Sequence, residues 1–196
     1  MKNLLITGFE PFGDQGMNPS WEAVKALPDA VEGVLLTKMQ LPVVFGKAAC
    51  LAIEKAEVIG ADAIIMVGLA GGRDAVTPEM VGINLRHAAI GDNEGNQPLD
   101  ERIAEGAPDA FFSTLPVRRM AEAISKAGIS AKVSYSAGTY VCNDILFTVL
   151  NHFKDSPVRA CFIHVPYTIG QKEGAPEFAL SDLVCALTVA IGAIDE

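Results

Sequence analysis

The hydrophobic positions of this chain form two kinds of segment that alternate along it. One kind is a short, nearly uninterrupted apolar run, which is typical of a strand buried on both faces of a parallel sheet. Runs of this kind cover residues 3–8, 63–69 and 160–166. Strands are also predicted at residues 34–41 and 131–136, and residues 81–89 are predicted to form an edge strand.

The other kind of segment repeats its apolar residues along one face of a helix. It predicts helices at residues 19–27, 43–59, 117–127, 141–153 and 177–194. Asn18 supplies an N-cap and Pro19 the first helical position of the first helix, and Gly60 closes the second. The helix at 141–153 is apolar over so much of its circumference that we expect it to be deeply buried.

This alternation predicts an α/β fold, a three-layer α/β/α sandwich around a mostly parallel mixed sheet. A length of 196 residues fits a single domain over residues 1–196, whose core needs no disulfide or metal. Ligands of open α/β sheets bind in the loops that follow the carboxyl ends of the strands, so functional residues are expected there.

Composition excludes several classes of function. Half of the residues are hydrophobic and a fifth are charged, which is typical of a globular protein and not of a disordered chain or a membrane span. The net charge of -9 argues against nucleic acid or an anionic membrane surface as a partner. The first apolar run is too short for a signal peptide, so we expect a cytoplasmic protein. The cysteines form no C-x-x-C pair, so free thiols are expected and no zinc or redox motif is predicted.

Cys142 is the strongest candidate for chemistry. It begins the predicted helix 141–153 after a stretch of small residues, and a thiol at a helix N-terminus feels a partial positive charge that favours thiolate. This position predicts a nucleophile. The alternative is a small buried hydrophobic residue at a strand-to-helix junction.

The three histidines are not equivalent. His152 is expected at a solvated helix end, and His87 alternates with apolar residues on the predicted edge strand. His164 ends a central apolar strand, where an imidazole costs desolvation free energy unless it has a partner. It is either a core histidine bonded to the backbone or a catalytic one.

Cys142 and His164 are predicted to meet. A strand, helix and strand with the usual right-handed crossover brings the start of the helix and the end of the second strand to one rim of the sheet. A carboxylate would then orient the imidazole, and Glu79 follows another strand on that rim. The alternative for Glu79 is an exposed loop charge.

Two loops on this rim carry further signals. Phe9 and Phe12 flank a proline, so these aromatic side chains either fold back on the core or form the wall of a pocket. Gly71 and Gly72 lack the spacing of a dinucleotide fingerprint, which excludes nucleotide binding.

With these motifs the chain resembles the pyrrolidone carboxyl peptidases, also called pyroglutamyl peptidases I, a family of cysteine peptidases. The matching motifs occur in family order and cover nearly the whole chain: Gly8-Phe9-Glu10-Pro11-Phe12-Gly13, Asn18-Pro19-Ser20, Val67-Gly68, Ala70-Gly71-Gly72-Arg73, Pro78-Glu79, Asp92-Asn93-Glu94-Gly95-Asn96-Gln97-Pro98, Ser136-Ala137-Gly138-Thr139-Tyr140-Val141-Cys142-Asn143 and Phe162-Ile163-His164-Val165-Pro166.

The resemblance implies an enzyme that removes N-terminal pyroglutamyl residues from small peptides through a thioester, without a cofactor or metal, as a cytoplasmic homotetramer. It implies that Cys142 is the nucleophile, His164 the general base and then acid, and Glu79 the group that orients His164. The expected substrate-binding residues are Phe9, Phe12, Asn18, Leu69, Tyr140 and Val141. Apolar walls with few polar contacts suit a neutral lactam ring, which carries no ammonium group.

The chain departs from the family pattern near this site. Leu69 replaces a usual glutamine, Met80 and Ala89 replace usual arginines, and Gly91 replaces a usual proline. These changes predict weakened activity. Two alternatives remain, namely a pyroglutamyl-binding protein with impaired catalysis and a different α/β hydrolase or phosphorylase. A general aminopeptidase is disfavoured, because neither a metal-ligand cluster nor an acidic anchor for a free amine is evident.

Overall fold

The computed structural model describes residues 2–13 and 15–194, and its centre is a mixed six-stranded sheet in the order β2-β3-β1-β4-β8-β5. The inner pairs β1/β3, β1/β4 and β4/β8 are parallel, whereas the short outer strands β2 and β5 are antiparallel to their neighbours. The strands are β1 (Lys2–Phe9), β2 (Ala30–Val31), β3 (Val34–Leu41), β4 (Ala63–Leu69), β5 (Thr77–Pro78) and β8 (Arg159–Val165).

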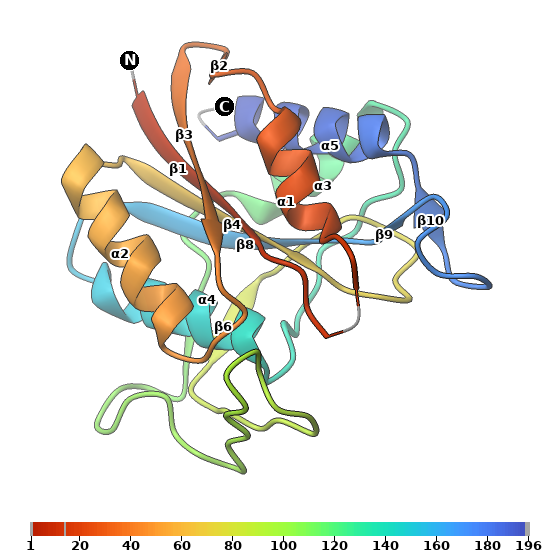
Figure 1. The fold of residues 1–196 in the computed structure, drawn as a ribbon. Helices are drawn as coiled ribbons and strands as arrows, with labels where there is room; N and C mark the ends of the chain where they lie inside the picture. Colours follow the sequence, from red (N-terminus) through yellow and green to blue (C-terminus); the bar gives the residue numbers. More distant parts are fainter. Residues whose placement is uncertain (1, 14, 195–196) are drawn as a thin grey trace.

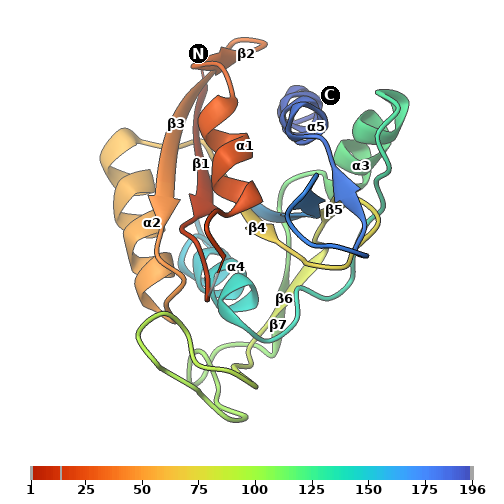
Figure 2. The same ribbon diagram turned by 45° about the vertical axis from the view of Figure 1, so that its right-hand side comes forward.

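Helices cover both faces of this sheet (Figures 1 and 2). One face carries α1 (Pro19–Ala26), α3 (Val117–Lys126) and α5 (Leu180–Gly192), and the other carries α2 (Lys47–Ile59) and α4 (Val141–His152). Alternate residues of a strand point to opposite faces, so Leu4 and Ile6 belong to the first core cluster and Leu5 to the second. The predicted three-layer α/β/α sandwich is confirmed.

Two small sheets lie beyond the main sheet. Strand β6 (Val81–Ile83) pairs antiparallel with β7 (Ala110–Phe112), and β9 (Tyr167–Thr168) pairs parallel with β10 (Glu177–Phe178). The pairing of β10 explains why the last helix begins at Leu180, three residues later than predicted. The backbone groups of residues 177 and 178 bond to a strand instead.

Helix α2 begins at Lys47 and not at residue 43. The N–H of Phe45 donates to the Asp92 carboxylate over 2.9 Å, and the N–H of Gly46 donates to the Asp144 carboxylate over 2.7 Å. These long-range partners keep residues 43–46 in a loop, although their apolar pattern fits a helix. Asn18 does cap α1, since its side chain accepts the Ser20 N–H, and Gly60 ends α2 in the left-handed conformation.

The strand predicted at 131–136 is present only as isolated bridges from Ala131 to Val76 and from Ser134 to Glu79. The ladder is interrupted because Pro78 lies in its middle and has no N–H to donate. The bridges are parallel to β5, which is itself antiparallel to β8, so this segment runs antiparallel to β8. The expected strand-helix-strand unit is therefore not formed. The predicted edge strand at 81–89 is likewise reduced to Val81–Ile83.

Candidate active site

A pocket of about 250 Å³ opens at the carboxyl ends of β1 and β4, beside the start of α4. This is the rim of the sheet at which the sequence predicts functional residues. The six residues expected to bind substrate all line it, together with the candidate nucleophile. The described lining residues are Phe9, Phe12, Asn18, Val43, Leu69, Gly71, Tyr140, Val141, Cys142 and Tyr167.

Cys142 is the second residue of α4, as predicted, and its sulfur packs against the backbone of β4. A Cβ atom built on Gly68 would lie 3.0 Å from Cys142 Sγ and 2.6 Å from the ring of Phe162, so only glycine fits there. Burial raises the pKa of the Cys142 thiol to about 12, and the Glu79 charge adds to this effect while Arg73 opposes it. The direction of this shift favours the neutral thiol and opposes the effect of the helix N-terminus.

His164 faces the same side of the sheet as Cys142. It pairs in register with Gly68 on the neighbouring parallel strand, so its side chain points toward the layer that contains α4. Only 4% of its surface is exposed, and its ring lies 4.7 Å from that of Phe162. Burial lowers the pKa of His164, whereas the bond to Glu79 acts in the opposite direction.

Glu79 is fully buried and binds His164. The Nδ1–H of His164 donates to Glu79 Oε1 over 2.7 Å, which leaves Nε2 as the reactive ring nitrogen. Burial by itself would raise the pKa of Glu79, but the hydrogen bond and charge of His164, with smaller contributions from Ser134 and Arg73, hold it below its usual value. The alternative for Glu79, an exposed loop charge, is wrong.

Arg73 joins this cluster from the loop after β4. Its Nη1 donates to Glu79 Oε1 over 2.6 Å and to Thr77 Oγ1, and its Nη2 donates to the carbonyl of Ser136 over 3.1 Å. Arg73 belongs to one of the matching sequence motifs, but no role was predicted for it. The available signal was one cation in a loop on the same rim as Glu79.

Two buried polar residues fix the start of α4. Asn143 Oδ1 accepts the Ile83 N–H over 2.9 Å, and Asn143 Nδ2 donates to the Ile83 carbonyl over 2.8 Å. Asp144 accepts the Gly46 N–H over 2.7 Å and pairs with Arg86, whose Nη2 lies 2.6 Å from its Oδ1. These contacts were not predicted from the sequence. Two polar residues in the first turn of an otherwise apolar helix were the sign of them.

Aromatic side chains form one wall of the pocket. The ring of Tyr140 meets Phe12 and Phe45 edge to face at 5.6 and 5.1 Å, and its hydroxyl donates to the Gly91 carbonyl over 2.9 Å. Asn18 uses its Nδ2 to hold the Glu10 carbonyl over 2.9 Å. Phe12 therefore forms part of the pocket wall, whereas Phe9 both lines the pocket and packs in the core, with 2% of its surface exposed.

The departures from the family pattern lie at different depths. Leu69 lines the pocket, Met80 packs against the core cluster of the α1 face, and Ala89 is exposed on a loop. Of these three, only Leu69 is among the residues that line the pocket. An effect of these residues on activity stays a prediction.

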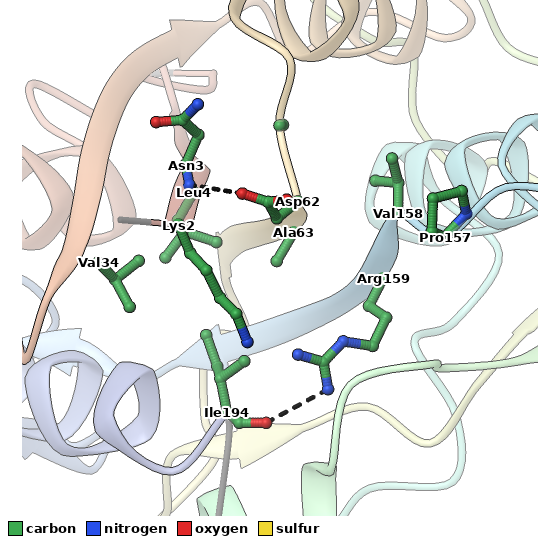
Figure 3. Close-up of a pocket in the computed structure, with 11 residues that line it drawn as sticks. Lys2, Asn3, Leu4, Val34, Asp62, Ala63, Pro157, Val158, Arg159 and Ile194 are labelled. Atoms are coloured by element: carbon green, nitrogen blue, oxygen red, sulfur yellow. Dashed lines mark hydrogen bonds between the residues drawn. The ribbon is translucent and has the colours of Figure 1, made fainter.

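A second cavity, of about 190 Å³, lies at the opposite ends of the strands (Figure 3). Its polar groups have partners within the chain: Asn3 N–H donates to Asp62 over 2.8 Å, and Arg159 donates to the Ile194 carbonyl over 3.3 Å. None of the sequence-predicted site residues lines it. It is therefore not the candidate site.

The described residues show neither a metal-ligand cluster nor a helix that could span a membrane. Across residues 2–13 and 15–194, no group of three or more His, Cys, Asp or Glu side chains is placed to hold a metal ion. Within the same ranges, no helix has the length and apolar character needed to cross a membrane.

Comparison with known proteins gives consistent results. Residues 2–196 match a sequence family described as pyroglutamyl peptidase. The pyrrolidone-carboxylate peptidase of Clostridium perfringens is 45% identical over 196 residues, which cover 97% of this chain and 92% of the relative. The crystal structure of Bacillus amyloliquefaciens pyroglutamyl peptidase I superposes with a TM-score of 0.96 at 43% identity, covering 99% of this chain and 97% of that one. The pyrrolidone carboxyl peptidase of Thermococcus litoralis gives 0.95 at 36% identity, with 99% and 93% covered.

Proposed function

The chain belongs to the pyroglutamyl peptidase family, cysteine peptidases that remove N-terminal pyroglutamyl residues, and we propose that Cys142, His164 and Glu79 carry out this reaction here. The observation that carries the assignment is the fully buried Glu79 carboxylate bonded to Nδ1 of His164, on the same side of the sheet as the thiol. This arrangement leaves one imidazole nitrogen to exchange protons.

The reaction begins from a neutral thiol and a neutral imidazole, since burial raises the pKa of Cys142 and lowers that of His164. Nε2 of His164 takes the thiol proton as the sulfur attacks the carbonyl carbon of the pyroglutamyl residue. When the tetrahedral intermediate collapses, His164 gives that proton to the leaving amine and a thioester remains. Water, deprotonated by His164, then hydrolyses the thioester to release pyroglutamate and the free thiol.

The start of α4 supplies donors for the oxyanion. The N–H groups of Asn143 and Asp144 bind the Tyr140 carbonyl, each over 3.0 Å. Among the described residues, no hydrogen-bond partner is found for the N–H group of Val141, and the N–H group of Cys142 interacts with its own thiol, whose pKa it lowers. The first N–H groups of a helix have no intrahelical partner, so we assign these two to the developing negative charge.

The pocket suits a lactam ring. Its lining among the described residues contains aromatic and aliphatic side chains and no carboxylate. A free α-amine would therefore lose its hydration without gaining a counter-ion, whereas a pyroglutamyl ring carries no such charge. The substrates that we propose are small peptides with an N-terminal pyroglutamyl residue.

The test replaces the nucleophile. We predict that Cys142→Ala abolishes release of a fluorophore from a pyroglutamyl amide while the circular dichroism spectrum stays unchanged. A prolyl amide, which carries a charged amine, serves as the substrate control and should be hydrolysed by neither protein. Comparable turnover by the variant would show that another group is the nucleophile.

We also propose that the enzyme is a cytoplasmic homotetramer. The family resemblance supports both statements, and several large apolar side chains support an assembly. Phe112, Tyr135 and Leu180 are 72%, 62% and 36% exposed in the isolated chain. Association would remove such side chains from water.

A further inference from the structure

One side chain, that of Arg73, links the carboxylate of the proposed triad to the segment that leads to its nucleophile. The guanidinium of Arg73 bonds to the Glu79 carboxylate and to the Ser136 carbonyl, 2.6 and 3.1 Å away. Ser136 belongs to the segment that leads into α4 and Cys142. We propose that Arg73 is a positioning residue, which keeps Glu79 ionised and directed at His164 and fixes the segment that carries the nucleophile. This inference rests on the proposed function.

His164 and Arg73 both donate to one oxygen of Glu79. Oε1 of Glu79 accepts Nδ1–H of His164 over 2.7 Å and Nη1–H of Arg73 over 2.6 Å. Burial by itself would raise the pKa of this carboxylate, and a permanent positive charge beside it opposes that shift. A guanidinium stays charged at all working pH values. Arg73 thus keeps Glu79 an acceptor both when His164 is neutral and when it is protonated.

Arg73 also bonds to the backbone before Cys142. Residues 130–134 run beside residues 76–80, but Pro78 removes one bond of that ladder. The last backbone bond of this pairing joins the Met80 N–H to the Ser134 carbonyl over 2.8 Å. The bond from Arg73 to the Ser136 carbonyl then reaches two residues farther along the segment. A planar donor that bonds to two acceptors defines their relative position more closely than one bond would.

Arg73 affects the pKa values of the site residues and does not line the substrate pocket. Its positive charge lowers the pKa of both Cys142 and His164, in each case opposing Glu79. It is not among the residues that line the pocket. Loss of Arg73 should therefore affect kcat and its pH dependence, and should leave KM nearly unchanged.

The experiment compares the parent with Arg73→Met and Arg73→Lys, measuring kcat and KM from pH 5.5 to 10 on one pyroglutamyl amide. Lysine keeps the charge without the planar pair of donors, and methionine keeps neither. We expect kcat to fall by about a hundredfold in both, with KM within about twofold of the parent value. The acid limb of the kcat/KM profile, which reports His164, should move to higher pH by about one unit in Arg73→Met only, because a nearby cation is lost.

Arg102, which pairs with Asp109 over 3.0 Å at an exposed site, gives the matched control Arg102→Met, with parent-like kinetics expected. A pH profile of Arg73→Met that superposes on the parent profile would overturn the proposal and reduce Arg73 to a structural role. If Arg73→Met does not fold, Arg73→Lys decides, since an unchanged kcat there would overturn the bridging role. Failure of the nucleophile assignment is separate, because only Cys142→Ala reports on it.

Discussion

At the scale of single residues, burial sets the charge of the reactive groups. The thiol of Cys142 and the imidazole of His164 have pKa values shifted in opposite directions by the same cause, loss of water. Both shifts favour the neutral form. The resting enzyme is therefore expected to contain little thiolate, and proton transfer accompanies attack on the substrate.

We predict from this that alkylation of Cys142 by iodoacetamide rises with pH up to pH 10 without a plateau, since its thiol pKa is about 12. An ordinary thiol has a pKa of about 8.5, so its alkylation rate approaches a plateau in that range. Peptide mass spectrometry separates Cys142 from the exposed Cys50 and Cys185, which act as internal controls in the same sample. A plateau for Cys142 below pH 8 would reveal a resting thiolate and imidazolium pair.

The second residue-scale prediction concerns Leu69, which lines the pocket and stands where the family pattern expected from the sequence has glutamine. If that amide donates a hydrogen bond near the reacting carbonyl, Leu69→Gln should raise kcat/KM by about tenfold, or roughly 1.4 kcal/mol of transition-state stabilisation. Ala89→Arg and the double variant complete the comparison. An unchanged or lower kcat/KM in the folded variants would contradict the prediction that these departures weaken activity.

At the scale of elements, the first turn of α4 is held by contacts that are remote in sequence. Asp144 is fully buried, and burial raises its pKa while Arg86 and the Gly46 N–H act against that shift. These contacts join α4 to the loop before α2. The position of Cys142 thus depends on a carboxylate two residues away.

We predict that Asp144→Ala lowers the free energy of unfolding by about 3–5 kcal/mol, because it removes a fully buried carboxylate that pairs with Arg86 and accepts the Gly46 N–H. Urea denaturation followed by circular dichroism measures this loss. Asp109→Ala, at an exposed ion pair, should change the same free energy by less than about 1 kcal/mol. A similar small effect at both positions would mean that the buried pair contributes little to stability.

The elements also show what sequence can and cannot predict. Strands β1, β4 and β8 were predictable because a continuous apolar run permits few other structures. The segment 131–136 was not, since its orientation depends on β5, a two-residue strand with no pattern of its own. In the site, Cys142, His164 and Glu79 stand out at strand or helix ends. The role of Arg73 depends on the Ser136 carbonyl, and backbone acceptors have no sequence signature.

At the scale of the whole molecule, the exposed apolar side chains lead to a prediction of mass. We expect sedimentation at micromolar concentration to give about four times the chain mass of 20.7 kDa. The exposed surfaces of Phe112 and Tyr135 should then be buried between chains, because association removes apolar area from water. A species of a single chain mass over that concentration range would contradict the tetramer.

The bare backbone beneath Cys142 has a consequence for how this protein can vary. Gly68 admits no side chain, and the same holds at Gly8, where a Cβ atom would lie 2.6 Å from the backbone of Trp21 at the start of α1. By contrast, a Cβ atom on Gly16 meets nothing within 4 Å. Mutational drift can therefore reshape the loops around the pocket while its floor stays closed to change. We expect a change of substrate preference to require substitutions in the pocket walls and not at Gly8 or Gly68.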